Sequence, residues 1–450
     1  ELARVERLGT DDGEVVVTAD ERVPLRRLDI YPSELTTDRL LTALHDAVLT
    51  RPDAWKDPLF GRRDPAFESV DETFVDNNDA QNRAVQRAVG AEDFALVHGP
   101  PGTGKTHTLA RIVRALVDRG DRVLVSAFTN RAVDNALEAL ESQGHAEFVR
   151  YGTESGVAES MQSHRLDRTG DPAATADRLQ SVPVVAATVA SCGSRALRSQ
   201  SFDVAVVDEA GQLTEPGTLA AITLADRFVL VGDHQQLPPV VRAENELQKS
   251  LFERLVETHP DVPVLLDRQY RMAQHIQSFP SREFYDGTLR PASAAVAGRS
   301  IADLPAVDSA QLPAHLRERV AFVDPGGAAD GNRNPTEAAA VAGVVENYRS
   351  AGLSEDAIGV IAPYRAQVAT IRQAVPEDVT VDTVDRFQGS SKEVIVVSFV
   401  ATGSLEGPIF EDYRRINVAL TRARRALVLV GDEATLSTDD VYRRMVEWAR

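Results

Sequence analysis

Residues 99–106 read GPPGTGKT, a stretch that fits the phosphate-binding pattern G-x-x-x-x-G-K-[ST]. It follows an apolar run at 94–99 and opens a helical pattern, THTLARIVRALVDRG, at 106–120. Glycines in such a loop let backbone N–H groups approach phosphate oxygens, and the helix N-terminus adds favourable dipole charge. Lys105 is expected to reach the β and γ phosphates, and Thr106 to ligate Mg²⁺. The loop as a whole is predicted to cradle a nucleotide: Gly99, Pro100, Pro101, Gly102, Thr103, Gly104, Lys105 and Thr106.

Two carboxylates end another apolar run, VAVVDEA (204–210). Asp208 at the strand end can hold Mg²⁺, directly or through water, and Glu209 can polarise a water that attacks a phosphate. Asp-Glu after a strand is a common pair. Here it follows the phosphate loop with two predicted strands between, a separation that favours one shared site. The chain is therefore predicted to hydrolyse a nucleotide.

Three later motifs offer groups for the γ-phosphate. GDHQQLPP (232–239) follows the next predicted strand, and a glutamine there can sense the γ-phosphate; a plain polar turn is the alternative. RQYRM (268–272) and NVALTRAR (417–424) contain arginines, whose planar fork suits the charge that develops on a transferring phosphoryl group. Read alone, the last motif is more often merely a basic helix face.

Short apolar runs alternate with helical patterns along most of the chain. Near-continuous apolar runs fit buried parallel strands covered by helices on both faces, so the chain is predicted to have an α/β fold. The pentapeptide VLVGD occurs at 229–233 and 428–432 and hints at two related sheets. Strands are expected at 94–99, 122–128, 183–189, 204–210, 228–233, 262–266, 320–324, 358–363, 379–384, 394–400 and 426–432.

The first 75 residues differ from the rest in pattern. EVVVTADERVPL (14–25) alternates like an antiparallel strand pair around a turn, SELTTDRLLTALHDAVL (33–49) is helical, and 55–65 is loop-like. The chain begins at Glu1 rather than Met, so we expect a piece of a longer protein. The predicted units are the end of a β accessory domain plus a connecting helix (1–75), a first α/β domain (76–260) with a small insertion at about 152–180, and a second (261–450).

Composition bears on the partner. The formal net charge of −19 argues against a nucleic-acid ligand, because phosphates repel acidic surfaces. However, only four of the 49 basic residues are lysine, a skew typical of salt-loving microbes or of a GC-rich genome. In molar salt the Debye length is about 3 Å, so a local arginine groove can still bind a strand. No apolar run is long enough to span a membrane, and the one cysteine, Cys192, allows no intrachain disulfide.

A set of motifs in a fixed order resembles the superfamily 1 helicases of the 5′-to-3′ branch. The likeness is strongest to the group of the nonsense-mediated-decay RNA helicase and the replication nuclease-helicases, and it covers roughly residues 76–435. The ordered set is specific, although several members alone are not. It consists of DAQNRAV (79–85), GPPGTGKT, AFTNRAVDNAL (127–137), AATVASC (186–192), VVDEAGQLTEP (206–216), GDHQQLPP, QYRM (269–272), IAPYRAQ (361–367), TVDRFQG (383–389) and NVALTRARRALVLVGD (417–432).

The resemblance implies two tandem RecA-like parallel-sheet domains that bind ATP with Mg²⁺. It implies that Gln81 reads the adenine and that Tyr270 stacks on its ring. The implied catalytic residues are Lys105, Asp208, Glu209, Gln236, Arg271 and Arg422, the last three around the γ-phosphate. Positions matching those that track a single strand are Thr129, Asn130, Thr188, Pro363, Tyr364 and Thr383.

Two positions depart from the family pattern. Gly211 stands where relatives often carry Ser, and we expect little effect. After FQG, relatives usually carry a basic residue and then Glu, whereas Ser390 and Ser391 stand there, followed by Lys392 and Glu393. In the family this Glu contacts a sugar. In this chain Glu393 could make that contact only if the loop is shifted.

Our hypothesis is an ATP-dependent helicase or translocase that moves along single strands 5′ to 3′, with DNA favoured over RNA. The alternatives are an RNA helicase or RNA–protein remodeller, a P-loop ATPase that remodels proteins without nucleic acid, and a binding module that uses ATP as a clamp. We expect a cytoplasmic monomer whose partner is single-stranded nucleic acid, with a nuclease domain fused upstream or acting in trans.

Overall fold

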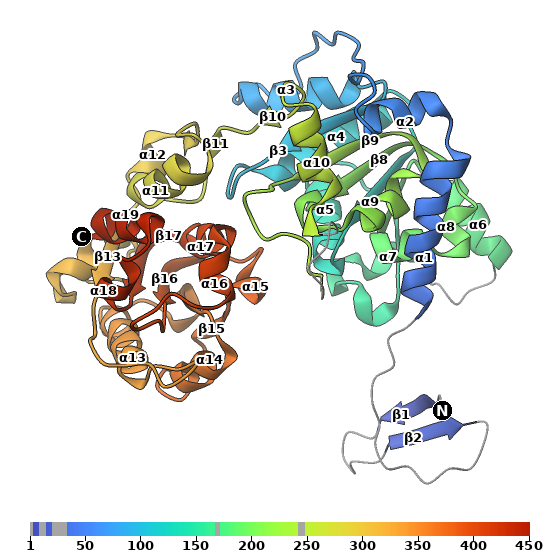
Figure 1. Cartoon of the computed structure of the whole chain (residues 1–450). Helices are drawn as coiled ribbons and strands as arrows, with labels where there is room; N and C mark the ends of the chain where they lie inside the picture. The colour runs from blue at the N-terminus through green and yellow to red at the C-terminus, as the bar shows by residue number, and fades with distance from the viewer. Residues whose placement is uncertain (1–2, 9–14, 20–33, 167–171, 242–247) are drawn as a thin grey trace.

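The computed structural model of the protein describes residues 3–8, 15–19, 34–166, 172–241 and 248–450. Two α/β lobes make up most of it (Figure 1). Each lobe is built on its own parallel sheet, one of eight strands and one of five. The predicted α/β class is confirmed, with two separate sheets in tandem.

The first sheet has helices on both faces. One face buries α3 (Asp79–Val89), α4 (Lys105–Asp118) and α5 (Asn130–Ser142). The other buries α1 (Glu34–His45), α9 (Glu215–Ile222) and α10 (Leu251–Thr258). The strand order is β10-β3-β9-β8-β4-β7-β5-β6, with β3 at Phe94–His98, β4 at Val123–Ala127, β5 at Phe148–Tyr151, β6 at Arg165–Leu166, β7 at Val184–Thr188, β8 at Phe202–Asp208, β9 at Ala225–Gly232 and β10 at Val264–Leu265.

The second sheet is also covered on both faces. The helices α13 (Pro335–Ser350) and α14 (Arg365–Arg372) pack on one face. On the other lie α11 (Gln274–Phe284), α15 (Val384–Phe387), α17 (Tyr413–Leu420) and α19 (Asp440–Ala449). The strand order is β13-β17-β16-β14-β15, with β13 at Val320–Val323, β14 at Ile358–Ala362, β15 at Thr380–Thr383, β16 at Lys392–Ser398 and β17 at Ala423–Val430.

The two sheets share one topology. Five neighbouring strands of the first, β3-β9-β8-β4-β7, come in the same chain order as β13-β17-β16-β14-β15 of the second. The strands β5, β6 and β10 extend the first sheet at its edges. The repeated VLVGD runs through the ends of β9 and β17, which hold the same place in their sheets. Corresponding strand ends can therefore be compared between the lobes.

The N-terminal part differs from prediction in two places. The strand β2 (Val15–Ala19) pairs antiparallel with β1 (Ala3–Leu8), a strand that was not predicted; the second half of the predicted pair falls at 20–25, which lie outside the described part. The segment 55–65, predicted as a loop, begins with the last turn of α2 (Asp53–Leu59). Trp55 and Leu59 are buried in the first lobe's core, and this tertiary packing outweighs the local proline and glycine signals.

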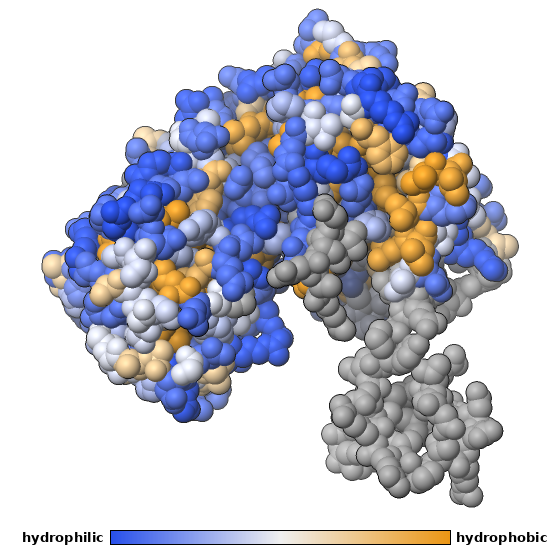
Figure 2. All heavy atoms as spheres, viewed as in Figure 1, coloured by the Kyte–Doolittle hydropathy of each residue, from blue (hydrophilic) through white to orange (hydrophobic). Residues whose placement is uncertain are grey.

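The helix α1 continues into a short π-helix, η1 (Asp46–Thr50), and lies along the first lobe. Its inner residues Ala43 and Ala47 are buried. Its outer side exposes an apolar stripe, visible at the right of Figure 2: Leu41, Leu44, Val48 and Leu49. No helix in the described ranges is long and apolar enough to cross a membrane.

The boundaries of the two lobes are not those of the predicted segments at every point. The strand β10 pairs with β3, so the first sheet extends beyond residue 261. Within 152–180, β6 joins the first sheet beside β5 and α6 (Pro172–Gln180) follows; 167–171 lie outside the described part. Short elements complete the lobes: α7 (Val189–Cys192), α8 (Arg195–Arg198), β11 (Arg268–Gln269), β12 (Arg290–Pro291), α12 (Ala294–Ala297), α16 (Pro408–Glu411) and α18 (Glu433–Leu436).

Candidate nucleotide and strand sites

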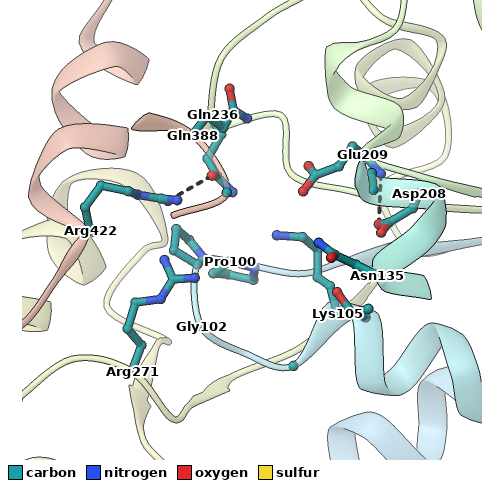
Figure 3. Close-up of a pocket in the computed structure, with 15 residues that line it drawn as sticks. Pro100, Gly102, Lys105, Asn135, Asp208, Glu209, Gln236, Arg271, Gln388 and Arg422 are labelled. Carbon is teal, nitrogen blue, oxygen red and sulfur yellow. Dashed lines mark hydrogen bonds between the residues drawn. The ribbon is translucent and has the colours of Figure 1, made fainter. Parts of the chain in front are cut away.

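The phosphate loop joins the end of β3 to the start of α4, at a cavity of ≈ 310 Å³ between the lobes. Figure 3 shows Lys105, Asp208 and Glu209 on one side of this cavity and two arginines of the second lobe on the other. The cavity is lined by Pro100, Pro101, Gly102, Gly104, Lys105, Thr106, Ala132, Asn135, Asp208, Glu209, Gln236, Arg271, Gln388, Gly389 and Arg422.

Left-handed glycines shape the loop. Gly104, with φ 81°, caps α4, and Gly102 has φ 78°. A Cβ on Gly102 would lie 2.6 Å from the Cβ of Arg271, so glycine allows the second lobe to approach. Lys105 Nζ donates to the Gly99 carbonyl at 2.7 Å, and this single bond to the loop leaves its other N–H groups for phosphate.

The carboxylates at the end of β8 have different surroundings. Asp208 is buried and accepts a hydrogen bond from the Glu209 backbone N–H at 2.9 Å. Burial and the nearby Glu209 raise the pKa of Asp208 to about 7, with Lys105 acting against them. Glu209 has φ 51°, which is unusual for a residue with a Cβ, and Gln212 Nε2 donates to its Oε2 at 2.7 Å. Strain of this kind is typical of a functional position.

The residues present fit Mg²⁺. Magnesium in such sites takes one or two protein oxygens and completes its shell with water and phosphate. Asp208 and the Thr106 hydroxyl line the same cavity and would be those ligands. In the described residues no group of three His, Cys, Asp or Glu side chains is placed to hold a metal, so a site made by protein alone is not seen there.

Gly211 has a larger structural role than expected. A Cβ at this position would lie 2.8 Å from the carbonyl oxygen of Asp233 and 3.1 Å from its carbonyl carbon. A serine there would force the carboxylate loop and the GDHQQLPP loop apart. The expectation of little effect is therefore wrong for this arrangement of the two loops, because the neighbour is backbone, which cannot rotate away.

Two arginines of the second lobe face the first. Arg422 Nη2 donates to Gln236 Oε1 at 3.3 Å, and Arg271 Nη1 to the Thr421 carbonyl at 3.1 Å. Burial and the nearby Arg422 lower the pKa of Arg271 to about 9, and burial lowers that of Arg422 to about 10. Neither makes an ion pair with any described residue. Arg422 is buried and Arg271 half-buried. The charge of Glu209 acts on both, but no carboxylate pairs with either directly, which favours an anion between them in the cavity.

The residues predicted for the adenine contact the phosphate loop but do not line the cavity. Gln81 is buried, and its Nε2 donates to the Thr103 carbonyl at 3.0 Å. Tyr270 is 42% exposed, and Asn78 Nδ2 donates to its hydroxyl at 3.0 Å. The Tyr270 backbone N–H donates to the Gly102 carbonyl at 2.8 Å. Asn78, which sequence reasoning missed, thus joins the N-terminus of α3 to Tyr270.

Comparison with known proteins gives the family. Models described as AAA domain match residues 76–171, 168–244 and 247–434. The DNA polymerase alpha-associated DNA helicase A of Schizosaccharomyces pombe is 33% identical over 84% of this chain and 68% of its own. The chain belongs to the superfamily 1 helicases. The DNA replication ATP-dependent helicase/nuclease JHS1 of Arabidopsis thaliana is 37% identical over 83% of this chain, which spans only 30% of that protein.

Among solved structures, arterivirus nonstructural protein 10, a helicase, is 18% identical with a TM-score of 0.45. The match covers 80% of this helicase chain and 63% of the viral chain.

The residues of this helicase that were predicted to contact a nucleic-acid strand lie at the ends of corresponding β-strands in the two lobes. Thr129 and Asn130 follow β4 and are exposed, whereas Thr188 at the end of β7 is buried, with its hydroxyl 3.1 Å from Ser191 Oγ. Pro363 and Tyr364 follow β14, and Thr383 ends β15; all three are half-buried. In both lobes the two strands are neighbours, and Ala127 pairs with Thr188 as Ala362 pairs with Thr383.

Asn130 is held in place by an ion pair that the sequence did not reveal. Arg150 lies in the middle of β5 and is fully buried; its Nε donates to Asp134 at 2.6 Å and its Nη2 to Asn130 Oδ1 at 2.8 Å. The charged residue interrupts the apolar run of β5, which is why no strand was predicted there. Paired and hydrogen-bonded, it can be buried.

Gln388 and Glu393 complete the comparison with the family pattern. Gln388 lines the cavity, and its Nε2 is buried without a partner among the described residues, which suits a donor to a ligand. Glu393 accepts from Arg425 at 2.7 Å and from Arg424 at 3.2 Å. Both bonds hold Glu393 against β17, which argues against the sugar contact that would need it.

Proposed function

We propose that this chain is an ATP-driven motor that moves along single-stranded DNA and unwinds or strips what lies ahead of it. The observation that carries this proposal is the repeat of polar strand ends. Exposed Thr129 and Asn130 follow β4 in the first lobe, and half-buried Pro363 and Tyr364 follow the corresponding β14 in the second. Thr383 ends β15 half-buried, whereas Thr188 at the end of the corresponding β7 is buried. Polar residues at equivalent β-strand ends, one set in each lobe, can bind a nucleic-acid strand at two points, with the nucleotide cavity between the lobes.

The cavity would couple nucleotide to lobe movement through its arginines. Arg271 and Arg422 are cations that a γ-phosphate would neutralise, so its presence favours the closed arrangement and its loss favours opening. Glu209 is placed to accept a proton from the attacking water. ATP with Mg²⁺ supplies the phosphoryl chemistry when bound, with Lys105, Thr106 and Asp208 as the residues that would hold it.

DNA is favoured because the relatives reported above are named as DNA helicases. The 5′-to-3′ direction and a nuclease, acting in trans or in the same polypeptide, belong to the same proposal. So do a monomeric state and a cytoplasmic location.

The test is ATP turnover in about molar KCl with Mg²⁺, where a salt-adapted acidic surface is screened. Three arms contain no nucleic acid, a single-stranded DNA, and an RNA of matching sequence. Stimulation by DNA alone supports the proposal, and stimulation by RNA alone would transfer it to an RNA helicase. Steady turnover indifferent to both polymers would contradict a strand motor and favour an ATPase that remodels proteins.

A further inference from the structure

A buried hydrogen-bond network crosses from one lobe to the other behind the nucleotide cavity. The first lobe contributes Asp233 and Gln236 at the end of β9 and His98 at the end of β3. The second contributes Tyr285, directly after α11, and Asn417 on α17. Tyr285 and Asn417 are buried, as are Asp233 and Gln236. None of the sequence motifs singled out Tyr285.

Asp233 is the centre of the network. Its Oδ2 accepts from Gln236 Nε2 at 2.7 Å and from the Tyr285 hydroxyl at 2.8 Å, while His98 Nε2 lies 3.0 Å from Oδ1. Burial alone would raise the pKa of Asp233, but the hydrogen bond and charge of His98 outweigh it and hold this pKa below its usual range. Burial and the neighbouring Asp233 raise the pKa of Tyr285, which therefore stays a phenol that can donate. One oxygen thus receives a donor from each lobe.

Asn417 continues the network toward the arginine of the cavity. Its Nδ2 donates to the Tyr285 hydroxyl at 2.9 Å and to the Gln235 carbonyl at 2.8 Å. Its helix, α17, ends directly before the Thr421–Arg422 segment. Tyr285 therefore accepts from the helix that leads to Arg422 and donates to the acid that orients Gln236. Asn417 Oδ1 is buried without a partner in the described ranges, so a second arrangement of this interface can gain a hydrogen bond.

We propose that Tyr285 is a positioning residue that transmits the state of the γ-phosphate site to the second lobe. A γ-phosphate that engages Gln236 changes the hydrogen bond that Gln236 donates to Asp233 Oδ2. The Tyr285 hydroxyl donates to the same oxygen and is therefore affected by the change. The change reaches α17 through Asn417 and re-aims Arg422. The inference rests on the proposed motor function, since it assigns the coupling between cavity and lobe movement.

The test compares Tyr285→Phe with Tyr348→Phe. Tyr348 is also buried, and its hydroxyl donates to the Leu316 carbonyl at 2.9 Å. The variant Tyr348→Phe therefore also loses one buried hydrogen bond, but one that lies wholly within the second lobe. For Tyr285→Phe we expect DNA-stimulated kcat to fall about tenfold, the size of one lost hydrogen bond to a charged acceptor. KM for ATP should stay within about twofold, because the cavity lining is intact. Tyr348→Phe should leave both constants unchanged.

A second readout does not depend on DNA. Small-angle scattering with a non-hydrolysable ATP analogue and Mg²⁺ measures closure of the lobes. Wild type and Tyr348→Phe should contract on adding the analogue, whereas Tyr285→Phe should contract less even when the analogue is saturating. Contraction and kcat like those of wild type would overturn the role of Tyr285. Wild type that contracts but is not stimulated by any single strand would instead contradict the motor function alone.

Asn417→Ala keeps the inference testable if the tyrosine variant is unstable. It removes the amide that binds Tyr285 from the other side, and its loss of kcat should not add to that of Tyr285→Phe in the double variant. Additive losses would show two independent structural effects and would overturn the proposed coupling.

Discussion

In the first lobe the C-terminal ends of the parallel strands are open to phosphates. In the second lobe the corresponding strand ends are filled by a side chain of the lobe itself. After β3 the chain forms the glycine loop, and Thr106 on α4 and Asp208 on β8 line one cavity. After β13 the chain leads to α13, and Glu337 in its first turn accepts hydrogen bonds from the Ser398 hydroxyl at the end of β16 and, at 2.9 Å, from the Val400 backbone N–H.

The hydroxyl and the carboxylate have exchanged places between the two sheets. In the first lobe the helix carries the hydroxyl and the strand the acid; in the second the helix carries the acid and the strand the hydroxyl. The second pair bonds directly and excludes a ligand. The backbone conformation is also similar in the two lobes: Glu209 (φ 51°) and Val400 (φ 69°) both have positive φ just past the corresponding strands. One topology thus yields a nucleotide site in one lobe and a closed support in the other.

The largest expected effect separates the two acids. Glu209→Gln should lower ATP turnover by about 1,000-fold, because the amide cannot accept the proton of the attacking water. Binding of a fluorescent ATP analogue should persist. The matched variant Glu337→Gln should retain turnover within about twofold. A large loss in both variants would show that the second edge takes part in hydrolysis and would break the comparison.

The arginines that the second lobe contributes come next. Arg422→Lys should lower kcat by about 100-fold, because a lysine cannot reproduce the planar fork at the developing phosphoryl charge. Arg425→Lys is the control, since Arg425 bonds to Glu393 at 2.7 Å and Asp303 at 3.1 Å within its own lobe. Steady-state kinetics should find that control close to wild type; equal losses would point to a general weakening of β17.

Stability should report the buried acid of the second lobe. Burial raises the pKa of Glu337 from its ordinary 4.5 to about 7, although the bonds from Ser398 and Val400 oppose the shift. The folded protein therefore keeps this proton to higher pH than the unfolded chain, and wild-type stability falls as pH rises between these values. Relative to wild type, Glu337→Gln should gain up to about 3 kcal/mol in free energy of unfolding across that window. Urea unfolding of both proteins at several pH values measures it; a constant difference would refute the assignment.

The smallest effect concerns the loop contact in the first lobe. Gly211→Ser should lower turnover about fivefold, because the Asp233 backbone must move to admit the Cβ. Gly343→Ser in α13 is the matched change, because nothing lies within 4 Å of an added Cβ there. Turnover of both variants and their melting temperatures decide the matter. Equal activity would show that the two loops can separate at no cost to catalysis.

The local motifs were predictable because each depends on a few neighbouring residues. Lys105 sits in a loop whose glycines define it, and Asp208 and Glu209 end an apolar run. The structure brings them with Gln236, Arg271 and Arg422 to one cavity. Thr188 was expected to contact a nucleic-acid strand, but it is buried. The sequence motif could not show this, because the exposure of Thr188 depends on how α7 packs over β7. Tyr285 has no local signature, since its role arises where the lobes meet.

By itself, the sequence determined the nucleotide chemistry and the α/β class, because loop glycines, strand-end carboxylates and apolar runs act over a few residues. Tertiary structure alone decided which sheet edge stays open and which is closed by Glu337. It also decided that Tyr285 of the second lobe would donate to Asp233 of the first and accept from Asn417. These outcomes join residues far apart in the chain, and their energies exist only once both sheets have folded and met.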